Sequence, residues 1–253
     1  MLKNRVIPVL LLENGRLVKT FKFQMPRYVG DPINAIHIFN EKEVDELVVL
    51  DISASKEGYE PNFELLEQLA GECFMPLTYG GGINNLEQAN RIFSLGIEKV
   101  CIQTGCLDDT ALITRLADRF GSQSIVVSVD IKRDWLGNPR LYSASRGKIV
   151  KKGWLEHIKS LIVAGAGEII LNSIDRDGTL LGPDIELIGI VSKQIRIPLV
   201  ALGGIGSLAD IKLAVDAGAN AVAAGSFFVF HGPHRAVLIT YPRYQDLEEL
   251  FAA

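Results

Sequence analysis

The chain has 253 residues, of which 48% are hydrophobic and 22% charged, and its formal net charge at pH 7 is −4. This balance is typical of a globular protein with a large apolar core, and it offers no excess of positive charge for nucleic acid or anionic membranes. No run approaches the roughly 18 apolar residues of a membrane span, and the three cysteines fit neither a disulfide framework nor a zinc site. We therefore expect a cytoplasmic protein that uses no metal or cofactor.

Short runs rich in β-branched residues alternate along the chain with longer segments of helical periodicity. This alternation predicts parallel strands joined by helices. In chain order, strands are expected at 5–11, 47–51, 76–79, 99–103, 125–130, 168–172, 198–201 and 221–224, and helices at 33–44, 63–73, 86–95, 109–120, 155–164, 185–193, 208–217 and 244–251. Asn85 and Ser207 are placed to cap two of these helices. The pattern predicts an α/β fold, a (β/α)8 barrel of the TIM type that forms a single domain over residues 1–253.

An internal repeat divides the expected barrel into two halves. Residues 76–104 recur at 198–226 with a constant offset of 122, so that Gly82 matches Gly204. An ungapped match of this length indicates a duplicated half-barrel. In each copy, glycines lie between a strand and the start of a helix, where backbone N–H groups and the helix dipole can hold an anion. We therefore expect two phosphate sites and a substrate with two phosphate ends.

A hydroxyl residue completes each of these glycine sites. Thr104 lies in the segment QTG after the next strand of the first half, and Ser226 ends the segment AAGS in the second half, beside Gly225. A single glycine run often serves only a tight turn. Because the glycine and hydroxyl pairing occurs twice, we favour phosphate binding over a role in packing alone.

Aspartates at the carboxyl ends of the strands are the candidates for acid–base chemistry. The active sites of such barrels lie at this face, and a carboxylate there can act as general acid or base. Asp130 ends the strand VVSVD and is the expected catalytic residue, while Asp51 ends VVLD and Asp177 lies in NSIDRDGT. Superimposing VIPVLL on IVVSVD places Leu11 at the position equivalent to Asp130. The first half of the barrel therefore lacks the acid that the second half carries.

Other charged residues begin several strands and would lie at the opposite end of the barrel. They are Arg5, Glu46, Lys99 and Glu168. Taken alone, these residues favour a girdle of salt bridges that closes the barrel floor. A separate basic cluster is interpreted as a solvent-exposed loop rather than a ligand site, and it consists of Arg146, Lys148, Lys151 and Lys152.

Specific motifs extend over nearly the whole chain apart from its tail. They are RVIP, GRLVK (15–19), VGDP (29–32), DELVVLDISAS (45–55), GGGI (80–83), FGSQ (120–123), DIKR (130–133), GAGEI (165–169), SIDRDGT (173–179) and GANA (218–221). Together they resemble the HisF family, the synthase or cyclase subunit of imidazole glycerol phosphate synthase. The resemblance implies a duplicated barrel and a substrate with two phosphates. We assign binding of the substrate and its phosphates to Lys19 of a mobile first loop and to Asp51, Gly82, Thr104, Asp177, Gly178, Gly204, Gly225 and Ser226.

The resemblance also implies a heterodimer in which a glutaminase of the HisH type docks on the amino-terminal face of the barrel. Ammonia made by the glutaminase would enter through a ring of charges at the floor and travel up the barrel to the substrate. The ring positions of the family match Arg5, Glu46, Lys99 and Glu168. We therefore expect an ammonia gate here rather than a girdle.

Leu11 is the main departure from the family, which uses two aspartates as an acid–base pair where this chain keeps only Asp130. Loss of one such group should remove about 3–5 kcal/mol of transition-state stabilisation. Gln103 and Leu202 also differ from the usual asparagine and serine. The stretches VLLLE and RYVGDPINA resemble paralogues from surface-polysaccharide gene clusters. There, ammonia would serve amidation of an acetamido sugar of lipopolysaccharide O-antigen, commonly with a separate sugar amidotransferase.

Two alternatives to this branch stay open. The chain could be a cyclase of histidine biosynthesis, which forms imidazole glycerol phosphate from a bisphosphorylated intermediate and ammonia. It could also be a non-catalytic conduit that activates the glutaminase and passes ammonia to a third protein. Leu11 favours the conduit, whereas Asp130 and the glycine sites favour catalysis. A sugar isomerase of the HisA type is disfavoured, because that family expects two aspartates and no gate.

Overall fold

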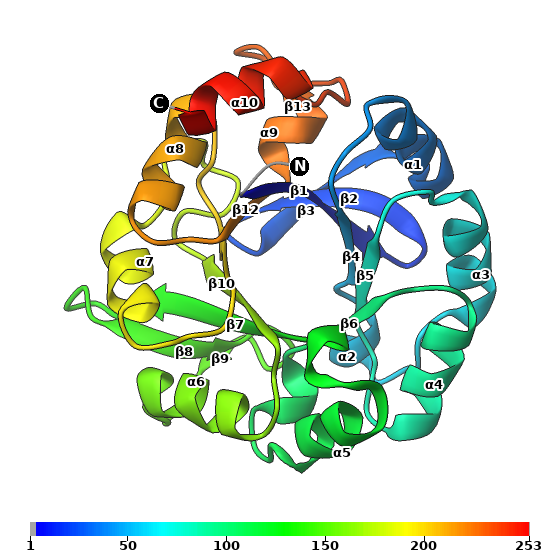
Figure 1. Cartoon of the computed structure of the whole chain (residues 1–253), viewed down its shortest axis with the longest axis vertical. Helices are drawn as coiled ribbons and strands as arrows, with labels where there is room; N and C mark the ends of the chain where they lie inside the picture. The colour runs from blue at the N-terminus through cyan, green and yellow to red at the C-terminus, as the bar shows by residue number, and fades with distance from the viewer. Residues whose placement is uncertain (1–3, 253) are drawn as a thin grey trace.

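A closed parallel barrel surrounded by helices forms the centre of the molecule in the computed structural model, which describes residues 4–252 (Figure 1). Its strands are β1 (Arg5–Glu13), β4 (Leu47–Asp51), β5 (Leu77–Gly80), β6 (Lys99–Ile102), β7 (Ile125–Arg133), β10 (Glu168–Ser173), β11 (Leu199–Leu202) and β12 (Ala221–Ala224). Each strand pairs in parallel with the next, and β12 pairs with β1 to close the barrel. The predicted (β/α)8 architecture is confirmed.

Helices cover the outside of the barrel (Figure 1). They are α1 (Pro32–Glu41), α3 (Phe63–Glu72), α4 (Leu86–Ser94), α5 (Ala111–Phe120), α6 (Trp154–Val163), α7 (Ile185–Ser192), α8 (Leu208–Asp216) and α10 (Tyr244–Ala252). Both predicted caps are confirmed, because the side chains of Asn85 and Ser207 accept hydrogen bonds from the backbone N–H of the third residue beyond them. Helix α1 ends three residues earlier than predicted, since Glu43 adopts a left-handed backbone with φ of 53°. Within residues 4–252, no helix has both the length and the apolar character needed to cross a membrane.

The internal repeat of the sequence is visible in the element boundaries. The bounds of β5, α4 and β6 become those of β11, α8 and β12 when each is shifted by the same 122 positions. Such agreement confirms that the two halves share one strand–helix–strand unit. Gly81 and Gly82 therefore occupy places equivalent to those of Gly203 and Gly204 on the opposite side of the barrel.

Alternation along each strand separates the barrel interior from the layer under the helices. In β1, Ile7 and Val9 point inward, whereas Val6 and Leu10 join the larger core beneath the helices. The inner cluster is apolar and buried, and it comprises Ile7, Val9, Val48, Cys101, Val126, Ile170, Val200, Ala221 and Ala223. Charged residues lie at the amino-terminal end of this cluster, and Leu11, Leu50 and Leu202 pack on it from the cavity at the carboxyl end.

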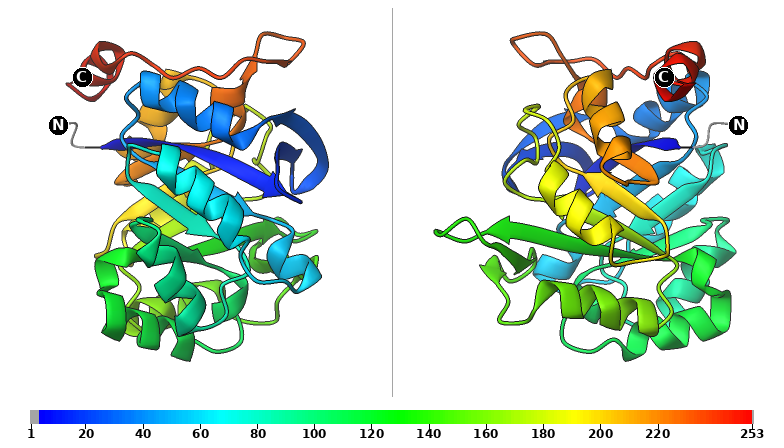
Figure 2. Two further views of the ribbon diagram at one scale, coloured as in Figure 1. Left: turned by 90° about the vertical axis from the view of Figure 1, so that its right-hand side faces the viewer. Right: turned by 60° about the vertical axis from the view of Figure 1, so that its left-hand side comes forward.

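Two antiparallel extensions of the barrel strands were not predicted. Strands β2 (Arg16–Phe21) and β3 (Gln24–Gly30) extend β1, and β8 (Pro139–Ser143) and β9 (Lys148–Ile149) extend β7. Both project from the same end of the barrel (Figure 2). The smaller elements are α2 (Ala54–Glu57), η1 (Thr104–Cys106), η2 (Ser122–Ser124), α9 (Ser226–Val229), β13 (Phe230–His231) and β14 (Ala236–Val237). The two extensions raise walls around the carboxyl ends of the barrel strands.

Candidate active site

A cavity of about 670 Å³ opens at the carboxyl ends of the barrel strands. Its walls come from the barrel strands and from both antiparallel extensions. The predicted site residues that line it are Lys19, Asp51, Thr104, Asp130, Asp177 and Gly225. The other predicted substrate-binding residues, Gly82, Gly178, Gly204 and Ser226, are not part of this lining. The carboxyl-face location expected for the chemistry is therefore where the structure gathers these groups.

Asp130 is a buried carboxyl on the wall formed by β7 and β10. Ser128 Oγ donates a hydrogen bond to Asp130 Oδ1 at 3.2 Å, and Asn172 stands beside Asp130 on the neighbouring strand. Burial raises the pKa of the Asp130 carboxyl to about 7, although hydrogen bonds from Ser128 and Asn172 act to lower it. A carboxyl with this pKa exchanges protons near neutral pH, which suits a general acid or base.

Leu11 belongs to an apolar wall of the same cavity. Leu11 and Leu50 are register partners on β1 and β4, and Leu202 joins them from β11 in packing on the inner apolar cluster. None of these side chains can exchange a proton. The position on β1 equivalent to Asp130 on β7 is therefore occupied by a hydrocarbon side chain that lines the same cavity.

Lys19 and Asp177 form a buried ion pair, which their separation in the sequence did not reveal. Lys19 Nζ lies 2.7 Å from Asp177 Oδ1, and each residue is only 6% exposed. Thr20 Oγ1 donates to Asp177 Oδ2 at 3.2 Å, and Lys22 N donates to the Asp177 carbonyl oxygen at 3.0 Å. The pair holds the β2–β3 hairpin against the loop after β10 and places a cation at the edge of the cavity.

Two of the predicted phosphate-site glycines are required for close packing between loops. A Cβ on Gly178, whose φ is +72°, would stand 2.7 Å from the Thr20 carbonyl oxygen, and one on Gly204 would stand 2.1 Å from the Gly182 carbonyl oxygen. Such contacts exclude any side chain. The sequence argument assigned these glycines to phosphate binding, and their backbone contacts add a structural reason for glycine at both positions.

The two hydroxyls of the glycine sites differ in their surroundings. Thr104 Oγ1 donates to Gln103 Oε1 at 2.9 Å, and Gln103 Nε2 donates to the Tyr142 carbonyl oxygen at 3.1 Å. Ser226 Oγ is buried and has no hydrogen-bond partner among the described residues. The N–H of Gly82 donates to Ser55 Oγ at 3.2 Å. The second site thus keeps an unsatisfied hydroxyl, whereas polar groups of the first already bond one another.

All four residues of the predicted basic loop are exposed, and one of them also lines the cavity. Lys148, Lys151 and Lys152 are exposed, as the sequence interpretation expected. Arg146 is exposed as well, and it also lines the cavity together with Ser145 and Gly147. The turn between β8 and β9 carries these residues to the edge of the cavity, so Arg146 is exposed to solvent and also borders the site.

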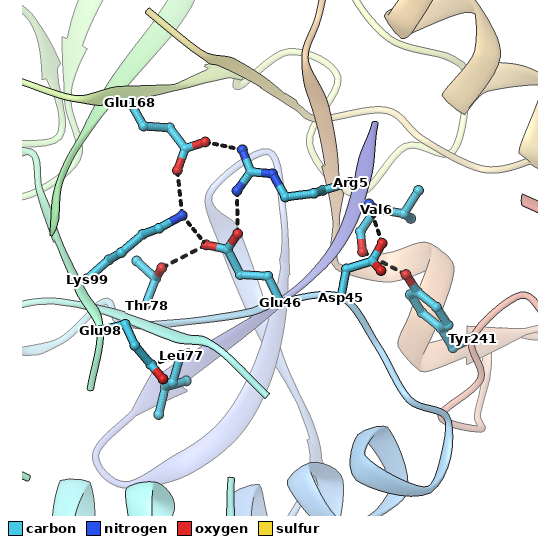
Figure 3. A network of polar contacts seen from close by, with 10 residues as sticks. All are labelled: Arg5, Val6, Asp45, Glu46, Leu77, Thr78, Glu98, Lys99, Glu168 and Tyr241. Atoms are coloured by element: carbon cyan, nitrogen blue, oxygen red, sulfur yellow. Dashed lines mark hydrogen bonds and ion pairs between the residues drawn. The ribbon is translucent and has the colours of Figure 1, made fainter. Parts of the chain in front are cut away.

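The four charged residues at the strand beginnings form a closed ring of ion pairs (Figure 3). Lys99 Nζ lies 2.9 Å from Glu46 Oε1 and 3.0 Å from Glu168 Oε2. The two terminal nitrogens of Arg5 pair with the remaining oxygens of the same two glutamates. Thr78 Oγ1 adds a hydrogen bond to Glu46 Oε1 at 3.1 Å.

The ring is buried on its acidic side and partly open on its basic side. The glutamate side chains are 5% and 8% exposed, whereas those of Arg5 and Lys99 are 29% and 20% exposed. The ring therefore occupies the floor of the barrel, directly below the inner apolar cluster. Its cations are the members that can reach solvent at the amino-terminal face.

Two cysteine thiols in or near the cavity are poor nucleophiles. Cys101 lines the cavity, but burial raises the pKa of its thiol well above the usual value. Burial likewise raises the pKa of Cys106 to about 12. Among residues 4–252, no group of three or more His, Cys, Asp or Glu side chains could hold a metal ion. Asp130 remains the titratable group best suited to chemistry in this cavity.

Sequence reasoning missed four residues that shape the two sites. Ser128 and Asn172 flank Asp130, Thr78 supports the ring and Arg146 lines the cavity. Ser128 and Thr78 lie two residues before Asp130 and Gly80 on their strands, so period-two alternation places each on the inward face. That signal was available. Arg146 carried no comparable signal, because its position depends on the unpredicted β8–β9 turn.

The chain was compared with known proteins. A family model described as "Histidine biosynthesis protein" matches residues 5–234. The chain belongs to this family. It is 55% identical to hisF2 of Pseudomonas aeruginosa, provisionally named an imidazole glycerol phosphate synthase subunit, over 98% of this chain and 99% of the relative. It is also 40% identical to the imidazole glycerol phosphate synthase subunit HisF of Streptomyces coelicolor, over 89% of this chain and 90% of that protein. This protein is therefore HisF-like, as the motifs predicted.

Proposed function

We propose that this HisF-like barrel is a synthase subunit that takes ammonia from a HisH-type glutaminase and uses it in the cavity above Asp130. Relatives that match over almost their whole length carry names of imidazole glycerol phosphate synthase subunits. The glutaminase would dock on the amino-terminal face, where Arg5 and Lys99 reach solvent. We place the complex in the cytoplasm, where the free cysteines would stay reduced.

The layered interior of the barrel supports an ammonia path. The inner apolar cluster lies between the ion-pair ring and Asp130. Neutral ammonia can cross an apolar lining, whereas an ammonium ion would lose its hydration there at a large cost in free energy. The ring is closed, so passage requires Arg5 or Lys99 to move aside. We therefore interpret the ring as a gate and the apolar cluster as a filter for the neutral species.

The duplicated glycine sites support a substrate with two phosphate ends. Thr104 and Gly81 line one side of the cavity and Gly225 lines another. The buried and unpartnered Ser226 Oγ near Gly225 is a ready donor for a phosphate oxygen. Lys19 would place a positive charge beside the same end of the substrate. Asp51 is a less direct contact, because its Oδ1 accepts three hydrogen bonds from Ser53 and Ala54.

The observation that carries our choice of branch is Leu11, which lines the cavity where the sequence repeat would place an acid equivalent to Asp130. Leu11, Leu50 and Leu202 line the cavity and cannot exchange protons, and Asp130 is the buried carboxyl in the lining whose pKa is raised to about 7. A single carboxyl with a pKa of about 7 can act as an acid or as a base, but it cannot serve as both at two separate positions of the substrate in one step. We therefore propose a paralogue that provides ammonia for amidation of an acetamido sugar of lipopolysaccharide O-antigen, with a sugar amidotransferase as a further partner.

Two other functions compete with this proposal. A histidine-biosynthesis cyclase would need to run lyase and ring-closing chemistry with Asp130 alone. A non-catalytic conduit would use the gate and the apolar interior but would not need Asp130, and Leu11 is the feature that favours it. The raised pKa of Asp130 and the retained glycine sites favour catalysis in the barrel.

The proposal is tested by co-expression with a HisH-type glutaminase from the same organism. We expect a complex at micromolar concentrations and faster glutamine hydrolysis in the presence of the barrel. No association, or association without stimulation, would refute the gate assignment. Growth of a cyclase-deficient histidine auxotroph on this gene would instead assign the chain to histidine biosynthesis.

A further inference from the structure

The turn between β8 and β9 carries a guanidinium over the cavity, and the proposed function does not use it. Arg146 lies in this turn and lines the cavity with Ser145, Gly147 and Thr104. We propose that Arg146 is the anion-binding arm of the first glycine site and takes the phosphate end of the substrate that Thr104 and Gly81 receive. The inference rests on the proposed function only in assuming a ligand with two phosphate ends.

The distribution of cations around the cavity motivates this assignment. Lys19 belongs to the second glycine site, since its Cε lies 2.9 Å from where a Cβ on Gly225 would stand. Lys56 on α2 and Arg146 are the remaining lysine and arginine that line the cavity within the described chain. Because Arg presents several N–H donors in a planar fork, it matches two phosphate oxygens at once, whereas Lys acts as a point charge. Arg146 is therefore better suited than Lys56 to bind a phosphate at the first glycine site, as Lys19 would at the second.

The contacts of Arg146 place it on the Thr104 side of the cavity. Its Nη1 lies 3.0 Å from Asp108 Oδ1, and Nη2 pairs with the other oxygen of the same carboxylate. Asp108 follows the short helix η1, which begins at Thr104. The strand β8 is also tied to this site, because Gln103 donates to the Tyr142 carbonyl oxygen. The guanidinium thus lies within the loop cluster that forms the first glycine site.

Asp108, which pairs with Arg146, presents to the guanidinium a group similar to the phosphate that we propose as the ligand. A carboxylate held by two guanidinium nitrogens presents two oxygens in the same plane, as a phosphate does. The Asp108 side chain is 67% exposed, and exposed ion pairs contribute little to stability. A phosphate carries more negative charge and would replace Asp108 at small cost. Lys19 differs, because its partner Asp177 is buried.

A second ion pair of the same extension serves as a matched control. Arg140 Nε pairs with Asp134 Oδ2 at 2.8 Å, and neither residue lines the cavity. Arg140→Gln therefore removes a positive charge from the same hairpin without touching the proposed site. Arg146→Lys keeps the charge of the arm but removes its planar fork.

Calorimetric titration of the whole chain with inorganic phosphate at low ionic strength tests the proposal. We expect Arg146→Gln to weaken binding at one of two sites by at least about tenfold, the usual worth of a charge-assisted hydrogen bond. Arg146→Lys should lie between that variant and the wild type. Asp108→Asn should tighten binding at the same site, since it frees the guanidinium, and Arg140→Gln should change nothing.

The outcomes separate this inference from the proposed function. Unchanged binding in Arg146→Gln, with weaker binding in Thr104→Ala, would overturn the role of Arg146 and leave the glycine site intact. Loss of binding in Lys56→Gln instead would assign the arm to Lys56. If the wild type binds no phosphate, both the role of Arg146 and the proposal of a substrate with two phosphates are wrong. Weaker binding in Asp108→Asn would show that the pair only holds the turn in place.

Discussion

Replacing Asp130 with asparagine should make the protein more stable and catalytically inactive. The Asp130 carboxyl has a pKa of about 7 in the folded chain against an ordinary value of 3.8, and burial is the main cause. Between these values the unfolded chain releases the proton that the folded chain retains. The free energy of unfolding therefore falls as pH rises from about 4 to about 7, by a total of about 4 kcal/mol. Below pH 4 both states are protonated and the cost disappears.

The asparagine side chain is neutral at every pH, so it carries no such cost. We expect Asp130→Asn and the wild type to have similar stability near pH 4, with the variant more stable by up to about 4 kcal/mol at pH 8. Urea unfolding followed by circular dichroism at pH 4.5, 6 and 8 measures this difference. Asp216→Asn, at an exposed helical position, is the control and should change the free energy of unfolding by less than about 0.5 kcal/mol at each pH.

The same variant tests the catalytic assignment. In the assembled complex, product formation should fall by about 10²–10⁴-fold, because the amide cannot transfer a proton. Equal pH dependence of stability in the variant and the wild type would refute the buried-carboxyl reasoning. Undiminished product formation alongside the predicted stabilisation would refute catalysis by Asp130 and support the conduit.

Three further changes test other parts of the structure. Leu11→Asp restores a second acid, and it should raise cyclisation of the histidine intermediate by about 10²-fold if that intermediate binds, which rescue of a cyclase-deficient strain would report. Glu46→Gln leaves two cations facing one glutamate, so the free energy of unfolding should fall by about 2 kcal/mol and ammonia should leak from the complex. If glutamine hydrolysis stays tightly coupled to product formation in this variant, the gate assignment is wrong. In thermal unfolding, Gly204→Ala should destabilise the fold by about 2 kcal/mol more than Gly96→Ala. Both glycines have positive φ, but only at Gly204 would the added Cβ contact a carbonyl oxygen. Equal losses of stability would show that the structure relaxes around this contact.

The sequence predicted the barrel because its signals were local or periodic. Hydrophobic periodicity located the eight barrel strands and their helices, and the offset of 122 related β5 and β6 to β11 and β12. The β1–β2 hairpin had a local signal in the sequence. Asn14 and Gly15 form a two-residue turn between β1 and β2, and both have positive φ, of 51° and 75°. An Asn-Gly pair between alternating strands is a strong hairpin signal.

Strand order and alternation also determined which residues share an end of the barrel. Because the carboxyl ends of parallel strands meet at one face, Asp130, Thr104 and Gly225 were placed together from their positions alone. The same argument collected Arg5, Glu46, Lys99 and Glu168 at the opposite face, and the closed ring bears out that placement. Superposition of the two halves of the sequence likewise showed that Leu11 occupies the position equivalent to Asp130.

Only the tertiary structure decided the partners within each face. Lys19 meets Asp177 across 158 positions, and Arg146 meets Asp108 above the cavity, through loops whose course no local pattern encodes. The pKa of Asp130 also depends on the whole fold, since it follows from burial by several strands together. Periodicity and repetition determine which way a strand residue faces, because both are properties of neighbouring positions in the sequence. The distance between two loop side chains depends instead on how all the elements pack together in the folded chain.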